Sequence, residues 1–350
     1  MRPTRLAVIG FGNVGKAFAR LLLAKRKELE ARGLEFVVTG IFTARHGQVV
    51  DRRGVDLEKA LEVETLWELD RRQQAIGGLE FIRKCPADIV VEISVLNPFN
   101  GEPALGYVTE ALSRSISVVT ANKGPIAFAY PKLLELARER GGQLLFEGTV
   151  LDGCPLFSLV RDTLPCTRIL GFRGIVNSTS NLILHLIEDG YSMKKAIAYA
   201  QEIGITETNP SYDLDGYDAQ LKTSILVQVL MGERLPPGKI ARSGIGGMHE
   251  KDIRSAARRG RHYQLVSTAQ RSGREVQASV GVAVLEKGDR LATVSGTSNG
   301  IIIETDTLHD LFISEANPGP AQTAYGVLAD CIRVAELVRR GRVSGGTCAW

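Results

Sequence analysis

The sequence predicts an α/β protein with a Rossmann-type, doubly wound parallel sheet and a second, mixed α+β domain. Three observations indicate this class: a glycine-rich turn directly after the first apolar run, strands that alternate with helices as far as residue 148, and a different order of elements beyond it. Strands that alternate with helices favour a parallel sheet covered by helices on both faces.

The first element is an apolar run, Leu6–Ile9, that ends at a glycine-rich turn. Apolar side chains then recur at helical spacing, at Val14, Ala17, Phe18, Leu21 and Leu22. A strand, a G-x-G-x-x-G turn and a helix form a dinucleotide-binding motif, because the first glycine permits the tight turn, the second lets a pyrophosphate approach, and the third lets the helix pack closely. The candidate cofactor contacts of this turn are Gly10, Phe11, Gly12, Asn13, Val14 and Gly15.

Further strands and helices alternate after this turn. Strands are expected at 36–42, 87–94, 117–122 and 143–148, and helices at 102–115 and 131–140. In a doubly wound sheet the ligand lies beyond the carboxyl ends of the strands. The loops at this edge supply the candidate cofactor contacts Thr43, Ala44, Arg45, Ser94, Asn122 and Lys123.

The end of the second strand indicates which nicotinamide cofactor is used. An NAD site usually has an acidic residue about 20 residues after the glycines, where it holds the ribose hydroxyls. Here the sequence reads "IFTARHG", without a carboxylate and with Arg45, which would pair with a 2′-phosphate. The sequence therefore predicts NADP before NAD, while use of both cofactors, or a solvated Arg45, stays open.

The composition is that of an ordinary globular protein. Of the 350 residues, 44% are hydrophobic and 23% are charged, and the net charge of +4 arises from scattered basic residues that indicate no nucleic-acid groove. The five cysteines lack metal-ligand spacing, and neither a signal peptide nor a membrane span is recognisable. We expect a cytoplasmic protein with reduced cysteines.

The second half of the sequence predicts a mixture of helices and strands, and one of the helices contains an unusually placed residue, Lys222. Helices are expected there at 181–190, 193–204 and 218–230, and strands at 169–176, 262–270, 275–285, 291–296 and 300–305. In the third helix Lys222 shares a stripe with Asp218 and apolar residues, while Gln220, Ser224 and Gln228 lie on the opposite side. A cation in this place is either half of an ordinary i,i+4 ion pair or a functional group.

Several blocks in a row resemble the homoserine dehydrogenase family, and the resemblance extends over nearly the whole chain. They are "GFGNVGKAF", "ANKGP", "NSTSNLIL", "GITETNPSYDLDGYDAQLK", "GIGGMHEKDIRSAARRG", "LATVSGTSNGII" and "GPAQTAYGVLADCIRV". The resemblance implies an oxidoreductase of amino-acid biosynthesis, on the way to threonine and methionine. It would interconvert L-homoserine and L-aspartate 4-semialdehyde with NADP or NAD.

The same resemblance implies roles for individual residues. Lys222 would be the proton donor and acceptor, Asp218 its orienting partner and Lys123 a second cation of the active site. Glu207, Asp213 and Thr179 would bind the amino-acid substrate. Oxidation of a primary alcohol needs a base to take the proton as hydride leaves carbon, and both burial and a neighbouring cation disfavour the charged form of a lysine.

The resemblance also implies the domain organisation. Residues 1–150 together with 315–342 would bind the dinucleotide, residues 151–314 would bind substrate and form a homodimer, and 343–350 would be a flexible tail. Glu147 and Val150 would help to hold a monovalent cation such as Na+, although Leu151 and Asp152 replace the family's small residues. Gly319 would contact the cofactor from a loop that has fewer glycines than is usual in the family.

Two alternatives remain at this point. A semialdehyde dehydrogenase acting through an acyl-thioester needs a cysteine nucleophile, and Cys154 is the one cysteine near the expected cleft, after a turn. A sensor or regulator of the Rossmann fold would bind cofactor without chemistry. Such a sensor needs the nucleotide turn but has no use for Lys123, Asp218 and Lys222.

Overall fold

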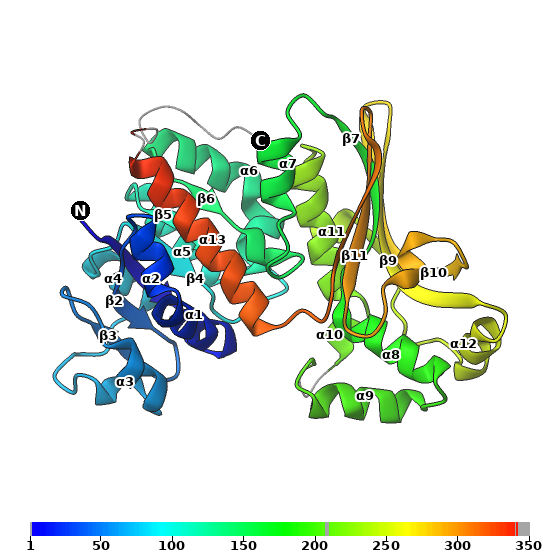
Figure 1. The fold of residues 1–350 in the computed structure, drawn as a ribbon, viewed down its shortest axis with the longest axis horizontal. Coiled ribbons are helices and arrows are strands. Elements are labelled where there is room, and N and C mark those ends of the chain that lie inside the picture. Colours follow the sequence, from blue (N-terminus) through cyan, green and yellow to red (C-terminus); the bar gives the residue numbers. More distant parts are fainter. Residues whose placement is uncertain (1, 207–209, 340, 342–350) are drawn as a thin grey trace. The chain divides into compact units, whose positions relative to one another are not determined.

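The computed structural model describes residues 2–206, 210–339 and 341, which fold into two compact units (Figure 1). The first unit contains the described residues up to Pro155 and those from Gly319 onward, and the second spans Leu156–Pro318. The predicted class, with a doubly wound sheet and a second mixed domain, is confirmed. Glu207 and the tail 343–350 lie outside the described residues.

The first unit is built on a six-stranded sheet of order β3-β2-β1-β4-β5-β6. Its strands are β1 (Thr4–Ile9), β2 (Phe36–Phe42), β3 (Gln48–Val50), β4 (Ile89–Glu92), β5 (Ser117–Thr120) and β6 (Leu144–Leu145). All neighbours pair in parallel except β2 and β3. Since β2 and β4 lie on opposite sides of β1, the order of strands reverses there, and a ligand crevice is expected at the carboxyl ends of β1 and β4.

Helices surround this sheet. They are α1 (Asn13–Ala24), α2 (Arg26–Ala31), α3 (Leu57–Glu62), α4 (Gly78–Lys84), α5 (Ala104–Ser113), α6 (Lys123–Arg140) and α13 (Pro320–Arg339), with 3-10 turns η1 (Leu66–Glu68) and η2 (Glu147–Thr149). The last helix, α13, packs beside α1, although the two are separated by the whole second unit in sequence (Figure 1).

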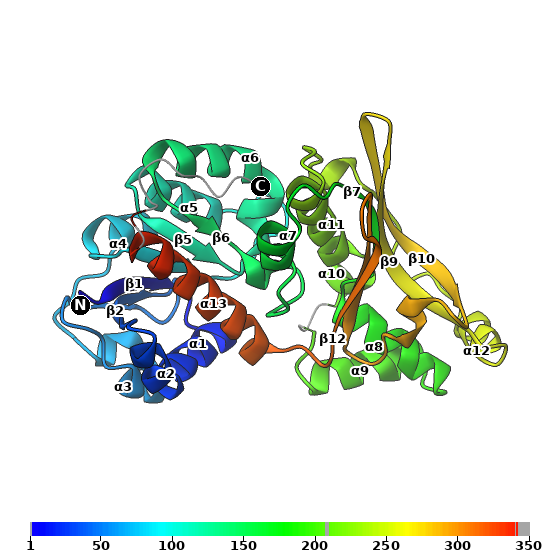
Figure 2. The ribbon, with the colours of Figure 1, turned by 45° about the horizontal axis from the view of Figure 1, so that its top comes forward.

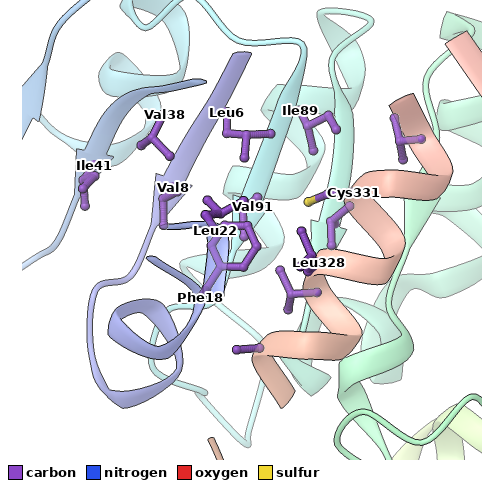
Figure 3. Packing of buried hydrophobic residues seen from close by; sticks show 14 of the residues in the cluster. Leu6, Val8, Phe18, Leu22, Val38, Ile41, Ile89, Val91, Leu328 and Cys331 are labelled. Atoms are coloured by element: carbon purple, nitrogen blue, oxygen red, sulfur yellow. The ribbon is translucent and has the colours of Figure 1, made fainter. Parts of the chain in front are cut away.

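One hydrophobic core joins the sheet to α1 and α13 (Figure 3). The strand residue Leu6 meets Phe18 of α1 and Leu328 of α13 in this cluster, and each is at most 2% exposed. Burial of a large apolar side chain contributes about 1.5–3 kcal/mol relative to exposure. The packing of the strands against α1 and α13 is therefore stabilised by the apolar side chains that meet in this core.

Helix α6 begins earlier than the sequence analysis predicts, at Lys123 instead of residue 131. Asn122 is its N-cap, and Asn122 Oδ1 accepts a hydrogen bond from Gly124 N (3.0 Å). Pro125 is tolerated because it lies in the first turn, where its missing N–H has no intrahelical partner to lose. Pro131 stands inside the helix. Pro125 and Pro131 are the reason that the sequence does not predict the start of this helix correctly.

The second unit is built on a mostly antiparallel six-stranded sheet of order β12-β11-β7-β9-β10-β8. Its strands are β7 (Ile169–Ile175), β8 (Ala241–Arg242), β9 (Arg261–Ser272), β10 (Glu275–Glu286), β11 (Asn299–Thr305) and β12 (His309–Glu315). Its helices are α7 (Phe157–Thr163), α8 (Ser178–Glu188), α9 (Met193–Glu202), α10 (Ser211–Leu214), α11 (Tyr217–Leu230) and α12 (Glu250–Ala257), with 3-10 turns η3 (Pro237–Lys239) and η4 (Arg290–Thr293). Helices α8, α11 and α12 pack against β9 (Figure 2).

The strand predicted at 291–296 is wrong. Residues Arg290–Thr293 form η4, and Asp289 is its N-cap: the Asp289 carboxylate accepts a hydrogen bond from Leu291 N (3.0 Å). Leu291 and Val294 are apolar because they pack into a small core with Val266, and not because they belong to a strand.

Helix α11 is buried on nearly all sides. The side of the helix opposite its apolar stripe is therefore not exposed to solvent. Ser224 and Gln228 are buried, like Ile225, and they form hydrogen bonds within the protein: Ser224 Oγ donates to Leu235 O (2.7 Å) and Gln228 Nε2 donates to Ser224 Oγ (3.1 Å). Lys222 therefore stands within a core helix. Within the described ranges, no helix is long and apolar enough to cross a membrane.

Candidate active site

The glycine-rich turn of the first unit joins β1 to α1. Gly10 has a φ of 101°, and a Cβ there would lie 2.4 Å from Ile93 O. At Gly15 a Cβ would lie 2.6 Å from Gly10 O, whereas at Gly12 it would meet no atom within 4 Å. Gly10 and Gly15 are thus required by the fold. Gly12 leaves open space at the N-terminus of α1, where backbone N–H groups favour an anion.

Thr43, Ala44 and Arg45 follow β2 in a tight connection to β3. Thr43 Oγ1 donates to Gly47 O (3.0 Å) and accepts from His46 N (2.8 Å), which closes the turn. Ala44 and Arg45 are exposed at its tip. The turn contains no carboxylate, in keeping with the absence of an acid in the sequence "TARHG".

Glu92, the last residue of β4, is a structural organiser of this edge that the sequence analysis did not identify. Its fully buried carboxylate accepts hydrogen bonds from Ser94 N (3.0 Å), from Ser94 Oγ and from Thr120 Oγ1 (3.1 Å). Asn122 Nδ2 in turn donates to Ser94 O (3.2 Å). Glu92 therefore ties the ends of β4 and β5 to the start of α6. An acid after an apolar run is equally typical of the first solvated residue of a loop.

We expect the Glu92→Gln variant to have a stability that depends less on pH than that of the wild type. Burial raises the pKa of Glu92 above its ordinary value of 4.5, against the opposing effect of its hydrogen-bond donors. The carboxyl's contribution to stability is therefore full below the unfolded pKa and is lost as pH rises through the folded pKa. The difference amounts to about 1.4 kcal/mol for each unit by which folding raises the pKa.

Denaturant unfolding of both proteins at several pH values measures this difference. Glu110→Gln is the matched control, because Glu110 pairs with Arg83 at the surface and its pKa is lowered by that hydrogen bond. A wild type and a Glu92→Gln variant whose stabilities change in parallel with pH would contradict the expectation.

Lys123 is the first residue of α6 and not part of a loop, which corrects the sequence analysis. The segment after β4 packs tightly against this helix start, since a Cβ on Gly124 would lie 2.7 Å from Gly101 Cα. Two glycines in contact thus hold the segment after β4 against the helix turn that carries Lys123.

Glu147, Val150 and Gly319 lie in a third part of the first unit. Glu147 is buried in η2, and its N–H donates to the Asp330 carboxylate of α13 (2.8 Å). Val150 follows η2 directly, and Gly319 precedes α13, where its carbonyl accepts from Thr323 N (3.1 Å). The loop after β6 and the start of the last helix are therefore packed together.

In the second unit, Lys222 is the centre of a buried polar cluster. Its ammonium donates to Val176 O (2.6 Å), and Nζ lies 3.5 Å from Asp218 Oδ2. Lys222 is 8% exposed and Asp218 5% exposed. Val176 directly follows β7, so a strand end and the aspartate one helical turn earlier together fix the direction of the amine.

Asn177 connects this pair to a second carboxylate. Its Nδ2 donates to Asp213 Oδ1 (2.8 Å) and to Asp218 Oδ2 (3.0 Å), while its Oδ1 caps α8 by accepting from Ser180 N (2.8 Å). Asn177 is not among the site residues predicted from the sequence. A signal was available, because an asparagine before "STS" is a typical N-cap, but its second task depends on tertiary contacts.

The predicted substrate residues of this unit occupy neighbouring elements. Asp213 lies in α10 and accepts a further hydrogen bond from Thr206 Oγ1 (3.1 Å). Thr179 is buried in the first turn of α8, two residues after Asn177. The structure thus brings Asp213, Asp218 and Lys222 together through Asn177, and Glu207 lies outside the described residues.

The described cysteines give little support to a thioester mechanism. Burial raises the pKa of Cys85 to about 11 and that of Cys331 well above its ordinary value, so both remain thiols. Cys154 lies in a turn, where its N–H donates to Leu151 O (2.8 Å), and it opens no helix that would favour a thiolate.

Comparisons with known proteins agree with the fold. Residues 155–332 match the sequence model described as homoserine dehydrogenase, and residues 10–147 match that of the homoserine dehydrogenase NAD binding domain. The chain is 31% identical over 348 residues to the NAD(+)-dependent homoserine dehydrogenase of Pseudomonas canavaninivorans, which covers 97% of this chain and 98% of the relative. It is also 31% identical to the homoserine dehydrogenase of Methanocaldococcus jannaschii, over 96% of this chain and 99% of the relative.

Solved structures show the same likeness. A putative homoserine dehydrogenase from Archaeoglobus fulgidus superposes with a TM-score of 0.84 at 28% identity, over 95% of this chain and 99% of that chain. A hyperthermophilic archaeal homoserine dehydrogenase in complex with NADPH superposes with a TM-score of 0.82 at 30% identity, over 96% of this chain and 98% of that chain. The chain therefore belongs to the homoserine dehydrogenase family of NAD(P)-dependent oxidoreductases.

Proposed function

We propose that this protein interconverts L-homoserine and L-aspartate 4-semialdehyde by hydride transfer with a nicotinamide cofactor, and that Lys222 exchanges the proton. The observation that carries this proposal is the buried ammonium of Lys222, held by Val176 O and by the Asp218 carboxylate. A buried lysine with two fixed acceptors is preorganised to hand a proton to an oxygen and to take it back.

The chemistry requires such a group. When hydride leaves the carbinol carbon, the hydroxyl proton must go to a base, and in the reverse direction an acid must protonate the developing alkoxide. Asp218, one turn before Lys222, orients the amine, and Asn177 holds Asp218 in turn. The nicotinamide cofactor accepts or supplies the hydride when bound.

The remaining roles follow from charge. The α-ammonium of an amino-acid substrate needs an acceptor, and Asp213 is a carboxylate held in place by Asn177 and Thr206. Glu207 and Thr179 would complete this set. Lys123, at the start of α6, is the proposed second cation of the active site.

Purified protein tests this function directly. L-homoserine added with NADP+ or NAD+ should raise the absorbance of the reduced nicotinamide, and L-aspartate 4-semialdehyde with the reduced cofactor should lower it. A protein that binds cofactor but shows neither change would be a sensor and not an enzyme.

We expect Arg45→Ala to shift cofactor preference from NADP towards NAD. The exposed guanidinium at the end of β2 would pair with the 2′-phosphate, and loss of a charge-assisted hydrogen bond of about 1.5–3 kcal/mol corresponds to a 10- to 100-fold change in the ratio of kcat/KM values. One relative is named NAD(+)-dependent and a solved one contains NADPH, so the family is compatible with either preference.

Paired kinetics with both cofactors measure this ratio. Arg52→Ala is the matched control, since Arg52 is an exposed arginine of the same unit in the turn after β3. Equal ratios in wild type and Arg45→Ala would show that Arg45 does not read the phosphate.

Two further parts of the proposal concern a cation and a second copy of the chain. The buried Glu147 and the Val150 carbonyl offer oxygen atoms of the kind that suits Na+, in a loop that packs against α13. Comparison of turnover in Na+ and in choline salts tests this site.

The second unit is proposed to form a homodimer. Light scattering during gel filtration measures the mass of the protein in solution and so tests this state.

A further inference from the structure

Tyr212, in α10, is a residue to which the proposed mechanism assigns no task. Its ring stacks on that of Tyr217, with the ring centroids 5.8 Å apart and the planes at 6°. On Tyr217 lies the guanidinium of Arg242, 3.5 Å from the ring centroid. This stack fixes the orientation of the Tyr212 ring and therefore the place of its hydroxyl.

The hydroxyl of Tyr212 is buried and has no hydrogen-bond partner among the described residues. Native proteins rarely leave a buried donor in this condition, because it has lost its hydrogen bonds to water and gained none. An unpaired buried group that is held rigidly is therefore a candidate for a partner that arrives with a ligand.

The surroundings of this hydroxyl belong to the Lys222 cluster. Burial raises the pKa of Tyr212 strongly, and the nearby charges of Asp218 and Asp213 raise it further. The phenol consequently keeps its proton throughout the ordinary pH range and acts as a donor beside two acceptors. Both of these carboxylates bind the same Asn177 amide.

We propose that the Tyr212 hydroxyl donates a hydrogen bond to the α-carboxylate of the amino-acid substrate. This inference rests on the proposed function, in which Asp213 binds the α-ammonium. Both groups are carried by one carbon atom, so the donor for the carboxylate must lie close to the acceptor for the ammonium. Tyr212 and Asp213 are adjacent in α10, and the hydroxyl lies within the electrostatic influence of the Asp213 carboxylate.

Tyr212→Phe tests the proposal, because it keeps the stacked ring and removes only the hydroxyl. We expect KM for L-homoserine to rise about 10- to 100-fold, as for loss of a hydrogen bond to a charged group, while KM for the cofactor is unchanged. The inhibition constant of 3-aminopropan-1-ol, which resembles homoserine without its carboxylate, should change less than about twofold. The variant should be at least as stable as the wild type, since a buried unpaired group has been removed.

Tyr217→Phe is the matched control, because it removes a hydroxyl from the partner ring of the same stack. Its KM for L-homoserine should equal that of the wild type. An unchanged KM in Tyr212→Phe, or an equal rise in both variants, would overturn the inference while leaving the reaction itself intact. A wild type that does not oxidise L-homoserine would instead overturn the proposed function.

Discussion

Replacement of Lys222 by alanine is expected to lower kcat by about 10²- to 10⁴-fold, the usual contribution of a positioned acid–base group. Binding of the cofactor should be unchanged, because the phosphate-binding turn belongs to the other unit of the chain. Stopped-flow or steady-state rates with L-homoserine, together with fluorescence titration of the reduced cofactor, measure both quantities.

Two further variants make this result specific. Lys222→Met keeps the length and packing of the side chain in the buried helix α11 without its amine, so it should be as inactive as the alanine variant and easier to fold. Lys194→Ala, an exposed lysine of α9 in the same unit, should retain full turnover. Turnover that survives in Lys222→Met would exclude the amine as the proton donor and acceptor.

The second large effect is expected at Gly10. Alanine there would need a φ of 101° and would place its Cβ 2.4 Å from Ile93 O, a backbone atom of the neighbouring strand end. We expect Gly10→Ala to lower the free energy of unfolding by about 3 kcal/mol or more, because both strain and a backbone clash arise. Thermal or denaturant unfolding measures the loss.

Gly12 provides the contrast within the same motif. A Cβ at Gly12 meets no atom within 4 Å, so Gly12→Ala should change stability by less than about 0.5 kcal/mol. It should nevertheless weaken cofactor binding about 10- to 100-fold, since the methyl group occupies the space where phosphate oxygens would approach the N–H groups of α1. Equal stability losses in the two variants would show that the two glycines do not have separate tasks.

Much of the first unit could be predicted because its signals are local. The glycine spacing after Leu6–Ile9 and the strand at 36–42 need no tertiary information, and β2 spans those residues. The start of α6 could not be predicted in the same way, because Pro125 and Pro131 argue against a helix and only the Asn122 cap reveals it. The half-exposed edge strand β12 was also missed, since its residues show no clear alternation of buried and exposed positions.

The candidate site likewise contains residues that local sequence signals predict and residues that they do not. Lys222 and Asp218 could be paired from their spacing of one helical turn, and the structure places them 3.5 Å apart. Asn177 and Glu92 could not be found, because each joins segments that are distant in sequence: Asn177 binds carboxylates 36 and 41 residues away, and Glu92 accepts from Thr120, 28 residues away. Their tasks arise only when strand ends come together in the folded sheet.

Helix α13 has a consequence for the way this protein is made. It supplies Leu328 and Cys331 to the core beneath α1, so the core of the nucleotide-binding unit combines segments that lie far apart in the sequence. While only the first 318 residues have been synthesised, the part of this core that α13 covers is therefore exposed. The unit whose synthesis starts first is therefore completed only after α13 has been made, and until then its exposed apolar surface favours aggregation.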